Sequence, residues 1–525
     1  MAVSSSLKPP VTPPVPLKTW IGVGGAMLGA FMAILDIQIT NASLQEIQAA
    51  LGATLEEGSW ISTAYLVAEI IVIPLTGWLS QIFSIRRYLL VNVALFTFFS
   101  VCCAWARSLP MMILFRALQG FTGGVLIPVA LTLVLRKLPP QKQPVGLAMF
   151  AVTAVFAPSI GPTMGGWLTE NFGWEYIFYL NIIPGLLLMS AVWYAIEAEP
   201  LRFDLLKQGD WGGIVAMVLG LGSLQVVLEE GSRKDWFSSP LIVKLTVVAV
   251  IFLTIFFIIE LTRKRPLLEL RLLMRRNFGL ATIINVALGL GLYGSVYILP
   301  LYLAQVQRYN SLQIGEVIMW AGVPQLFLVP FVPKLMKRID LRVLIGTGIS
   351  LFAISCLMNS IMTNQTGYEQ LRVSQFVRAM GQPLIMVPLS SIATTGIEPA
   401  LAASASALFN MMRNLGGSIG IASLATLLQN REHFHSNRLG ESISMYAPET
   451  QQRIEQLTQY FIQKGFDAVT ANQQALEALS HTVRQEAFVM AYNDCFHFIG
   501  IALLVSGLAV LFFKKSKPAG GATAH

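Results

Sequence analysis

The sequence has 525 residues, of which 54% are apolar and only 12% are charged. Soluble domains carry about 25% charged residues, so this composition, with a mean hydropathy of +0.63, excludes an ordinary soluble protein and indicates a polytopic membrane protein. The net charge of +8 does not indicate nucleic acid binding, because the basic residues gather in short segments between apolar runs.

Fourteen apolar runs follow one another along the chain, each of roughly 20 residues and long enough to cross a bilayer. They lie near residues 20–42, 59–80, 88–106, 109–135, 145–167, 175–196, 210–229, 240–261, 277–304, 311–333, 341–362, 371–395, 401–428 and 487–513. With the amino terminus inside, most lysine and arginine residues fall on the inner side, as expected for membrane proteins. We therefore expect an all-α polytopic membrane protein with both termini in the cytoplasm.

An internal repeat divides these spans into two halves. RALQGFTGGVLIP from Arg116 in the fourth span is similar to RAMGQPLIMVP from Arg378 in the twelfth, and both spans run from outside to inside. Two six-helix bundles around an inserted pair of helices are predicted. The expected parts are a cytoplasmic disordered tail over 1–19, an N-terminal bundle over 20–196, two inserted transmembrane helices with linkers over 197–276, C-terminal bundle helices over 277–428, a long periplasmic loop over 429–486, and a last transmembrane helix with a cytoplasmic tail over 487–525.

The fifth span contains the stretch APSIGPTMGGWL, from Ala157 to Leu168. Proline removes a backbone donor and glycine removes a side chain, so this segment should bend and let another helix approach closely. An ordinary close-packed helix pair is the alternative. The residues that give this pattern are Pro158, Gly161, Pro162, Gly165 and Gly166.

Three ionisable residues lie inside spans of the N-terminal half: Asp36, Glu69 and Arg116. The helix rise places all three about 9–14 Å below the outer surface, in one layer. Buried ionisable groups mark pathways or relays, so Asp36 is predicted as the leading protonation site and Arg116 as its tuning partner. Glu69 is either a second protonation site or the group that meets a cationic ligand. The alternative is a static Asp36–Arg116 ion pair with Glu69 hydrogen-bonded and neutral.

In the other half, Arg378 and Arg413 lie in spans without an acidic residue of their own. Backbone carbonyls, Asn410 and Asn414, or a bound anion must therefore meet them. A central pocket lined by apolar and aromatic residues would suit large hydrophobic substrates. Its candidates are Tyr65, Tyr293, Tyr297, Arg378, Phe409 and Arg413, and Asp494 and His497 near the end of the chain are weaker candidates for chemistry.

The segment 429–486 is polar and predicted to lie outside. It contains a helix candidate from Pro448 to Lys464, with Ile454, Leu457 and Phe461 at helical spacing, and a second over about 471–484. We interpret the segment as an external docking element, with a passive cover as the alternative.

Cofactor and enzyme chemistry find little support in the sequence. His433, His435 and His481 lack a recognised ligand spacing, so no metal site is expected. The four cysteines should pack as small hydrophobes. Because no nucleophile with its base and no phosphate loop are visible, we expect no enzyme activity and no cofactor beyond a proton gradient.

Several motifs resemble the successive signatures of the major facilitator superfamily. They are LDIQITNASL from Leu35, GWLSQIFSIRR from Gly77, LFRALQGFTGG from Leu114, IGPTMGG from Ile160, WEYIFYLNIIPG from Trp174 and NMMRNLGGSIG from Asn410. The resemblance covers nearly the whole chain. It is strongest to the fourteen-span drug/proton antiporter branch with its EmrB-type multidrug efflux pumps.

This resemblance implies roles for individual residues. Asp36 and Arg116 match positions linked to proton coupling. The glycines and prolines of the fifth span match the antiporter motif, which is thought to shape the interface between halves and limit leak. A gating loop with Gly77, Arg86 and Arg87 is also implied, but Gln81 stands where that loop usually has an acid and Ser84 where it has a glycine.

The expected function is a proton-coupled antiporter that exports amphipathic drugs across the inner membrane and confers antibiotic resistance. The resemblance also implies partners, a periplasmic adaptor and an outer-membrane channel, which would give the segment 429–486 its role. One alternative is a dedicated exporter of an endogenous metabolite or siderophore. The other is a membrane sensor or scaffold that uses the same fold without transport.

Overall fold

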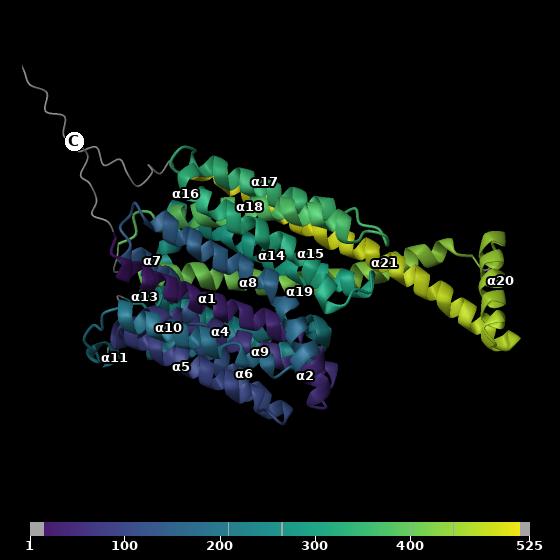
Figure 1. Ribbon diagram of the computed structural model, residues 1–525, viewed down its shortest axis with the longest axis horizontal. Helices are drawn as coiled ribbons and strands as arrows, with labels where there is room; N and C mark the ends of the chain where they lie inside the picture. Colours follow the sequence, from purple (N-terminus) through teal and green to yellow (C-terminus); the bar gives the residue numbers. More distant parts are fainter. Residues whose placement is uncertain (1–14, 208, 264–265, 399–400, 445, 515–525) are drawn as a thin grey trace, which may run out of the picture.

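The computed structural model describes residues 15–514, apart from 208, 264–265, 399–400 and 445. This part of the chain is built from helices and contains no strand (Figure 1). Thirteen of its helices are long and apolar enough to cross a membrane. A further helix, α19 (Ala402–Ser442), covers the predicted span at 401–428 and continues into polar sequence, so each predicted span coincides with helix.

The first bundle contains the six spans predicted for the N-terminal half. Its helices are α1 (Leu17–Ala42), α4 (Trp60–Phe83), α5 (Ile85–Ala104), α6 (Leu109–Gly123) followed by α7 (Leu126–Lys137), α8 (Gln143–Phe172), and α9 (Tyr176–Tyr179) followed by α10 (Ile182–Ala195). Two short helices, α2 (Leu44–Ala50) and α3 (Leu55–Gly58), connect the first two spans.

The second bundle repeats this arrangement. Its helices are α14 (Arg276–Gln305), α15 (Ser311–Leu328) with η4 (Val329–Phe331) and α16 (Val332–Leu335), α17 (Leu341–Asn359), α18 (Tyr368–Thr394), α19, and α21 (Ala468–Gly507) with η5 (Leu508–Phe512). In both bundles the first span packs on the fifth, the second on the fourth, and the third on the sixth. The predicted pair of similar six-helix bundles is therefore confirmed.

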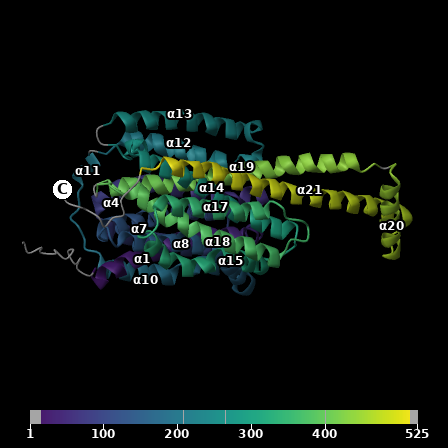
Figure 2. The ribbon, with the colours of Figure 1, turned by 90° about the horizontal axis from the view of Figure 1, so that it is seen from above.

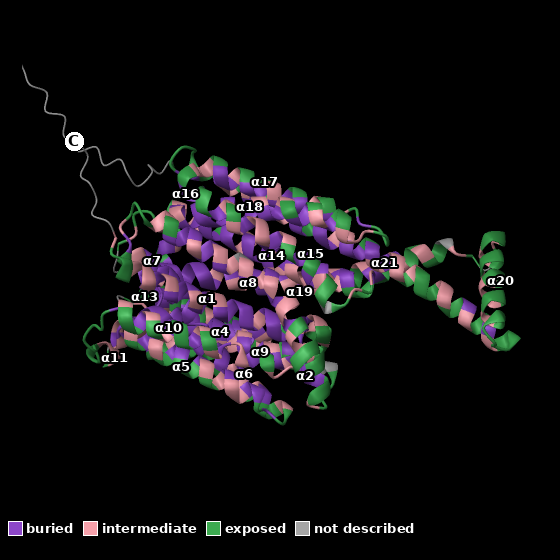
Figure 3. Ribbon diagram, in the orientation of Figure 1, coloured by how far each residue is buried: buried purple, intermediate pink, exposed green. Residues whose placement is uncertain are grey.

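The two bundles meet through the same pair of positions on both sides. The second span of the first bundle, α4, packs on the fifth span of the second bundle, α19. Reciprocally, α15 packs on α8. Buried residues gather between the helices of both bundles (Figure 3). Two-fold related halves of this kind are the architecture in which rigid bundles rock against each other.

The inserted pair lies at the edge of the molecule. It consists of α12 (Trp211–Glu230) and α13 (Pro240–Thr262), with α11 (Asp204–Lys207), η1 (Ser232–Lys234), η2 (Trp236–Ser238) and η3 (Leu270–Met274) in the connections. Figure 2 shows α13 outermost, with α12 between it and the bundles. Because α12 packs on α4 and α19, the pair covers one of the two seams between the halves.

The segment 429–486 differs from the predicted loop. Helix α19 runs on to Ser442 and α21 already begins at Ala468, so two spans extend beyond the bundle as a helical stalk (Figures 1 and 2). Helix α20 (Pro448–Gln463) stands across its tip. The polar sequence ends the membrane span, but it contains good helix formers and therefore does not end the helix.

The details of the stalk tip follow the sequence pattern. The stripe of Ile454, Leu457 and Phe461 is half-buried, and α20 packs on α21. Asp467 caps α21 by accepting hydrogen bonds from the Thr470 hydroxyl at 2.6 Å and from the Thr470 backbone N–H at 3.2 Å. These hydrogen bonds hold the pKa of Asp467 below its ordinary value. The second helix predicted over about 471–484 is the outer part of α21.

Candidate functional site

The glycines of α8 bring it into close contact with α1. A Cβ at Gly161 would lie 2.5 Å from the Cβ of Gln38, and one at Gly165 would lie 3.0 Å from the carbonyl oxygen of Ile39. Pro158 and Pro162 both stand inside the helix. The close approach predicted for this stretch is confirmed.

The same helix faces the other half on its second side. Ser159 and Thr163 of α8 lie against Gly322 and Gly315 of α15. Glycines of α8 therefore allow its close packing on α1, and glycines of α15 allow the close packing of α8 on the opposite bundle. Gly166 is also buried.

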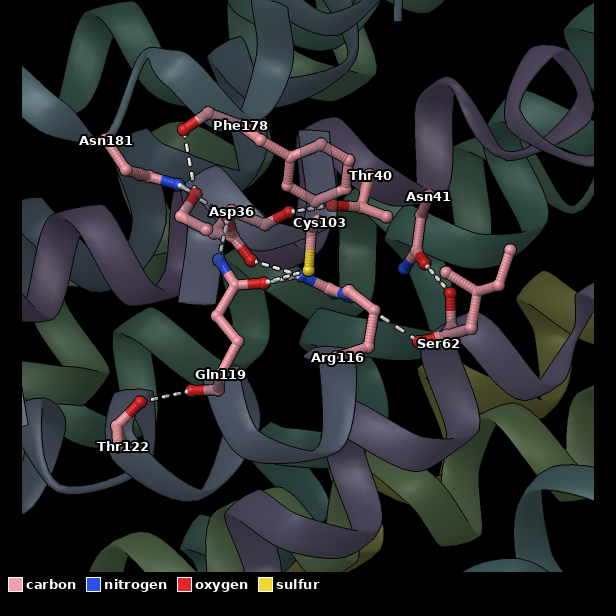
Figure 4. Close-up of polar contacts among 12 residues, drawn as sticks. Asp36, Thr40, Asn41, Ser62, Cys103, Arg116, Gln119, Thr122, Phe178 and Asn181 are labelled. Carbon is pink, nitrogen blue, oxygen red and sulfur yellow. Dashed lines mark hydrogen bonds and ion pairs between the residues drawn. The ribbon is translucent and has the colours of Figure 1, made fainter. Parts of the chain in front are cut away.

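A buried ion pair joins α1 to α6. Nη1 of Arg116 lies 2.6 Å from Oδ2 of Asp36, and both side chains are 1% exposed. The amide nitrogens of Gln119 and Asn181 donate to Oδ1 of Asp36 at 2.9 and 2.7 Å (Figure 4). Three donors, one guanidinium and two amides, thus surround one carboxylate.

Arg116 is held by groups from several helices. It donates to Oε1 of Gln119 at 2.7 Å and to the carbonyl of Ile61 at 3.4 Å. The ring of Tyr65 lies 4.3 Å from its guanidinium carbon, which allows a cation–π contact. Removing one partner of such a buried pair leaves an unpaired charge and costs about 3–5 kcal/mol.

Glu69 lies apart from this ion pair. Its carboxylate accepts a hydrogen bond from the side-chain amide of Asn414 on α19 at 3.4 Å, and the residue is 4% exposed. The structure therefore brings Asp36 and Arg116 together, as predicted, but points Glu69 toward the second half. Depth along a helix was predictable for all three residues, whereas the direction in which each side chain points was not.

Arg378 and Arg413 line a central cavity between the bundles. In this conformation it is narrow, with about 20 Å³ of free space, and it is lined by Ile34, Ala154, Pro158, Ser159, Leu292, Tyr293, Val296, Ile318, Ala321, Arg378, Met386 and Arg413. The neighbouring acceptors are amides, since Arg378 donates to Gln375 at 3.5 Å and Arg413 to Asn410 at 2.9 Å.

The aromatic pocket candidates separate into two groups. Tyr293 lines the cavity, while Tyr65, Tyr297 and Phe409 do not. Tyr65 packs on Arg116 instead, and Phe409 lies against Phe278 with 6.4 Å between ring centroids.

The predicted gating loop has few charge contacts among the described residues. Arg86 stacks on the ring of Trp193 at 4.3 Å, and Arg87 donates to the carbonyl of Glu199 at 3.4 Å. Gly77 lies against Ala403 of the second half. Ser84 has a φ of 69°, a value that favours glycine.

The weaker candidates near the end of the chain lie at the base of the stalk. Asp494 bridges Arg431 and His435, the latter at 2.7 Å, and thereby ties α21 to α19. His497 is exposed. Among the described residues, no group of three or more histidine, cysteine or acidic side chains could hold a metal ion. The four cysteines are free thiols.

Several polar residues of the interior were not singled out from the sequence. Gln119 and Asn181 complete the hydrogen bonds to Asp36. Both lie inside motifs given above, and the sequence feature that could have identified them is a polar amide side chain within an apolar span. Glu230 at the end of α12 accepts from the hydroxyls of Ser59 and Thr63, both at 2.9 Å. This buried acid fixes the inserted pair to α4.

Comparison with known proteins shows where this architecture recurs. The family model described as Major Facilitator Superfamily matches residues 26–421. Relatives include the colistin resistance protein EmrB of Acinetobacter baumannii, 33% identical over 96% of this chain and 98% of that protein. Another is the multidrug export protein EmrB of Escherichia coli, 32% identical over 94% and 95%. An auto-inhibited peptide transporter of the POT family superposes with a TM-score of 0.60 at 12% identity, over 97% of this chain and 99% of that one.

Proposed function

Because the chain belongs to the major facilitator superfamily, and is thus a membrane transporter and not an enzyme, we propose that it exports amphipathic compounds in exchange for protons. It would act in the inner membrane, with both termini in the cytoplasm and the stalk in the periplasm. The relatives named for multidrug export support the cargo class. The reciprocal packing of α4 on α19 and of α15 on α8 supports export by rocking of the two bundles.

The observation that carries the proton step is the buried Asp36–Arg116 pair. In this conformation Asp36 is balanced by Arg116 and by two amides. A proton on Asp36 would cancel the negative charge, leave Arg116 unbalanced, and so favour a conformation in which water or another group meets the guanidinium. Loading and release of this proton would therefore be linked to the shape of the first bundle.

Glu69 offers a second proton step at the seam between the bundles. It accepts one long hydrogen bond from Asn414 of the opposite half. Protonation of the carboxylate weakens its attraction to the amide donor and to the positive charge of nearby Arg413. We propose that Asp36 is the leading site and that Glu69 couples its own proton to separation of α4 from α19.

The test measures proton release from everted vesicles by dye quenching, using a compound to which a deletion strain is hypersensitive. Asp36→Asn and Glu69→Gln should each reduce compound-driven proton release by tenfold or more. Asp204→Asn makes the same change at an exposed aspartate of α11 and should leave the signal unchanged. Elution as a single species shows that each variant has folded.

A static ion pair gives the opposite pattern. Asp36→Asn would then lower the melting temperature while the vesicles still pump against a gradient, and this result would rule out the proton role.

We further propose that the stalk tip docks a periplasmic adaptor, which in turn reaches an outer-membrane channel. Large apolar side chains are exposed there: Tyr446 is 91% exposed, Val469 71%, and Tyr460 51%. Exposed apolar groups on a water-facing extension are typical of protein contact surfaces.

The docking test replaces residues 443–467 by a short Gly-Ser turn that joins α19 to α21. The excision stops at residue 467 because α21, which continues into the last span, begins at Ala468. Membrane insertion should be unaffected, and co-purification of the adaptor should be lost. Retained co-purification rejects the docking role of the tip.

A further inference from the structure

The two halves treat their equivalent arginines differently. Arg116 and Arg378 begin the repeated motif, and each stands on the fourth span of its bundle, α6 and α18. In the first bundle, Asp36 on the first span pairs with Arg116. The first span of the second bundle, α14, carries no aspartate or glutamate from Arg276 to Gln305. The first span of the second bundle therefore has no counterpart of Asp36 to balance Arg378.

Arg378 is buried without a balancing charge among the described residues. It is 5% exposed, it donates a long hydrogen bond of 3.5 Å to Gln375, and its Nε has no hydrogen-bond partner among the described residues. The ring of Phe352 lies 5.4 Å away. A guanidinium stays protonated in proteins, so it cannot relieve the cost of burial by losing its charge.

Arg413 presents a second guanidinium to the same cavity. It donates to Asn410 at 2.9 Å, while its Nε also has no partner among the described residues. Glu69 of α4 faces Arg413 across the seam and accepts a hydrogen bond from the neighbouring Asn414, so its charge balances part of this one. Within the described residues, no ion pair joins Glu69 to either arginine.

The remaining lining of the cavity is mostly apolar. It includes Ile34, Leu292, Val296, Ile318 and Met386, and no described lining residue is acidic. The cavity thus combines two cationic groups with an apolar wall, and none of its described lining residues supplies a negative charge.

We propose that the cargo is an amphipathic monoanion whose carboxylate binds Arg378 and Arg413, while its apolar body lies along this wall in a conformation in which the two bundles have moved apart to admit it. This inference rests on the proposed function and narrows its cargo. A carboxylate matches the donor geometry of guanidinium groups and would supply the acceptor that each Nε lacks. When Glu69 is charged it balances Arg413, and the single negative charge of the cargo then balances Arg378. Without a negative cargo one of the two guanidinium charges has no balancing anion, so affinity should depend strongly on the charge of the cargo.

The test compares ligands that share one apolar chain and differ only in charge. Purified protein in nanodiscs is titrated with dodecanoate, methyl dodecanoate and dodecyltrimethylammonium, and empty nanodiscs serve as the reference for partition into lipid. Dodecanoate should bind at least tenfold more tightly than the ester, and the cation should bind more weakly than both. Equal binding of acid and ester, or preference for the cation, overturns the proposal.

Two variants assign the charge preference to the cavity. Arg378→Gln should abolish the difference between dodecanoate and its ester without weakening ester binding. Arg372→Gln makes the same change on the same helix, at a side chain that is 42% exposed and paired with Glu369, and should keep the difference. The comparison on the unmodified protein decides the question even if Arg378→Gln does not fold.

Failure of this inference is distinguishable from failure of the proposed exchange. If dodecanoate binds through Arg378 but drives no proton release from vesicles, the anion site stands and the antiport is wrong. If a cation drives release that depends on Asp36 while dodecanoate does not bind, the antiport stands and the anion site is wrong.

Discussion

Ser84 adopts a backbone conformation that glycine tolerates and other residues rarely adopt, with φ 69° and ψ 140°. Strain of this kind costs about 1–3 kcal/mol. Its hydroxyl oxygen accepts a hydrogen bond from the backbone N–H of Glu199 at 3.1 Å, which offsets part of that cost by about 1 kcal/mol. Ser84→Gly should therefore relieve the strain and lose the bond, whereas Ser84→Ala loses the bond and keeps the strain.

The expected result is that Ser84→Gly unfolds at a higher temperature than Ser84→Ala, by an amount equivalent to about 1–3 kcal/mol. Thermal unfolding of both variants in one detergent, followed by tryptophan fluorescence, measures this. Because both variants lack the hydroxyl, their difference isolates the backbone term. Equal melting temperatures would mean that this turn is not strained.

Single residues also show how far the sequence can be interpreted. A helix rises a fixed distance per residue, so the common depth of Asp36, Glu69 and Arg116 was predictable. Which way each side chain points depends on the neighbours of its helix, and the structure pairs only Asp36 with Arg116. Gln119 and Asn181 were not predicted, because a neutral amide costs less to bury than a charge and its presence in a span is therefore weaker evidence for a functional site.

At the scale of helices, the packing of α8 on α1 depends on the absence of a side chain at Gly161. An alanine Cβ there would lie 2.5 Å from the Cβ of Gln38, so one helix must move. We expect Gly161→Ala to destabilise the protein by about 1–3 kcal/mol, the usual cost of overpacking, and to reduce export. Gly24→Ala on α1 is the matched control, because nothing lies within 4 Å of its Cβ position.

Thermal unfolding and export by the two alanine variants are measured side by side. Gly24→Ala should match the parent protein or exceed it, since alanine has the higher helix propensity. If Gly161→Ala is as stable and as active as Gly24→Ala, the glycine is not needed for close packing.

The limits of helix prediction lie in what a hydropathy pattern reports. Runs of about 20 apolar residues located the spans, because the thickness of the bilayer sets their length. The same pattern cannot tell where a helix ends in water, and so the segment 429–486 was predicted as a loop although α19 and α21 extend into it from both ends. The stripe of Ile454, Leu457 and Phe461 did predict the inner face of α20, because helical spacing is independent of the membrane.

At the scale of the whole molecule, the reciprocal contacts of α4 with α19 and of α15 with α8 form the two seams along which the halves must slide or separate. The cavity with Arg378 and Arg413 lies between these seams. A cargo bound there touches both bundles, so its charge can influence their relative position. Motion across a seam is thus the common requirement of cargo release and of proton exchange.

A reversible covalent link across one seam tests that motion. A Cβ at Gly77 of α4 would lie 3.6 Å from the Cβ of Ala403, at the start of α19 in the second half of the chain. This separation falls within the range of about 3.5–4.5 Å found in disulfides, so Gly77→Cys combined with Ala403→Cys should form one on oxidation. Compound-driven proton release should then stop, and a reducing agent should restore it.

Each single variant is the control, since the four native cysteines stay in place and report their own sensitivity to oxidant. Full activity of the cross-linked double variant would show that Gly77 and Ala403 move as one unit, and the rocking would then have to occur elsewhere.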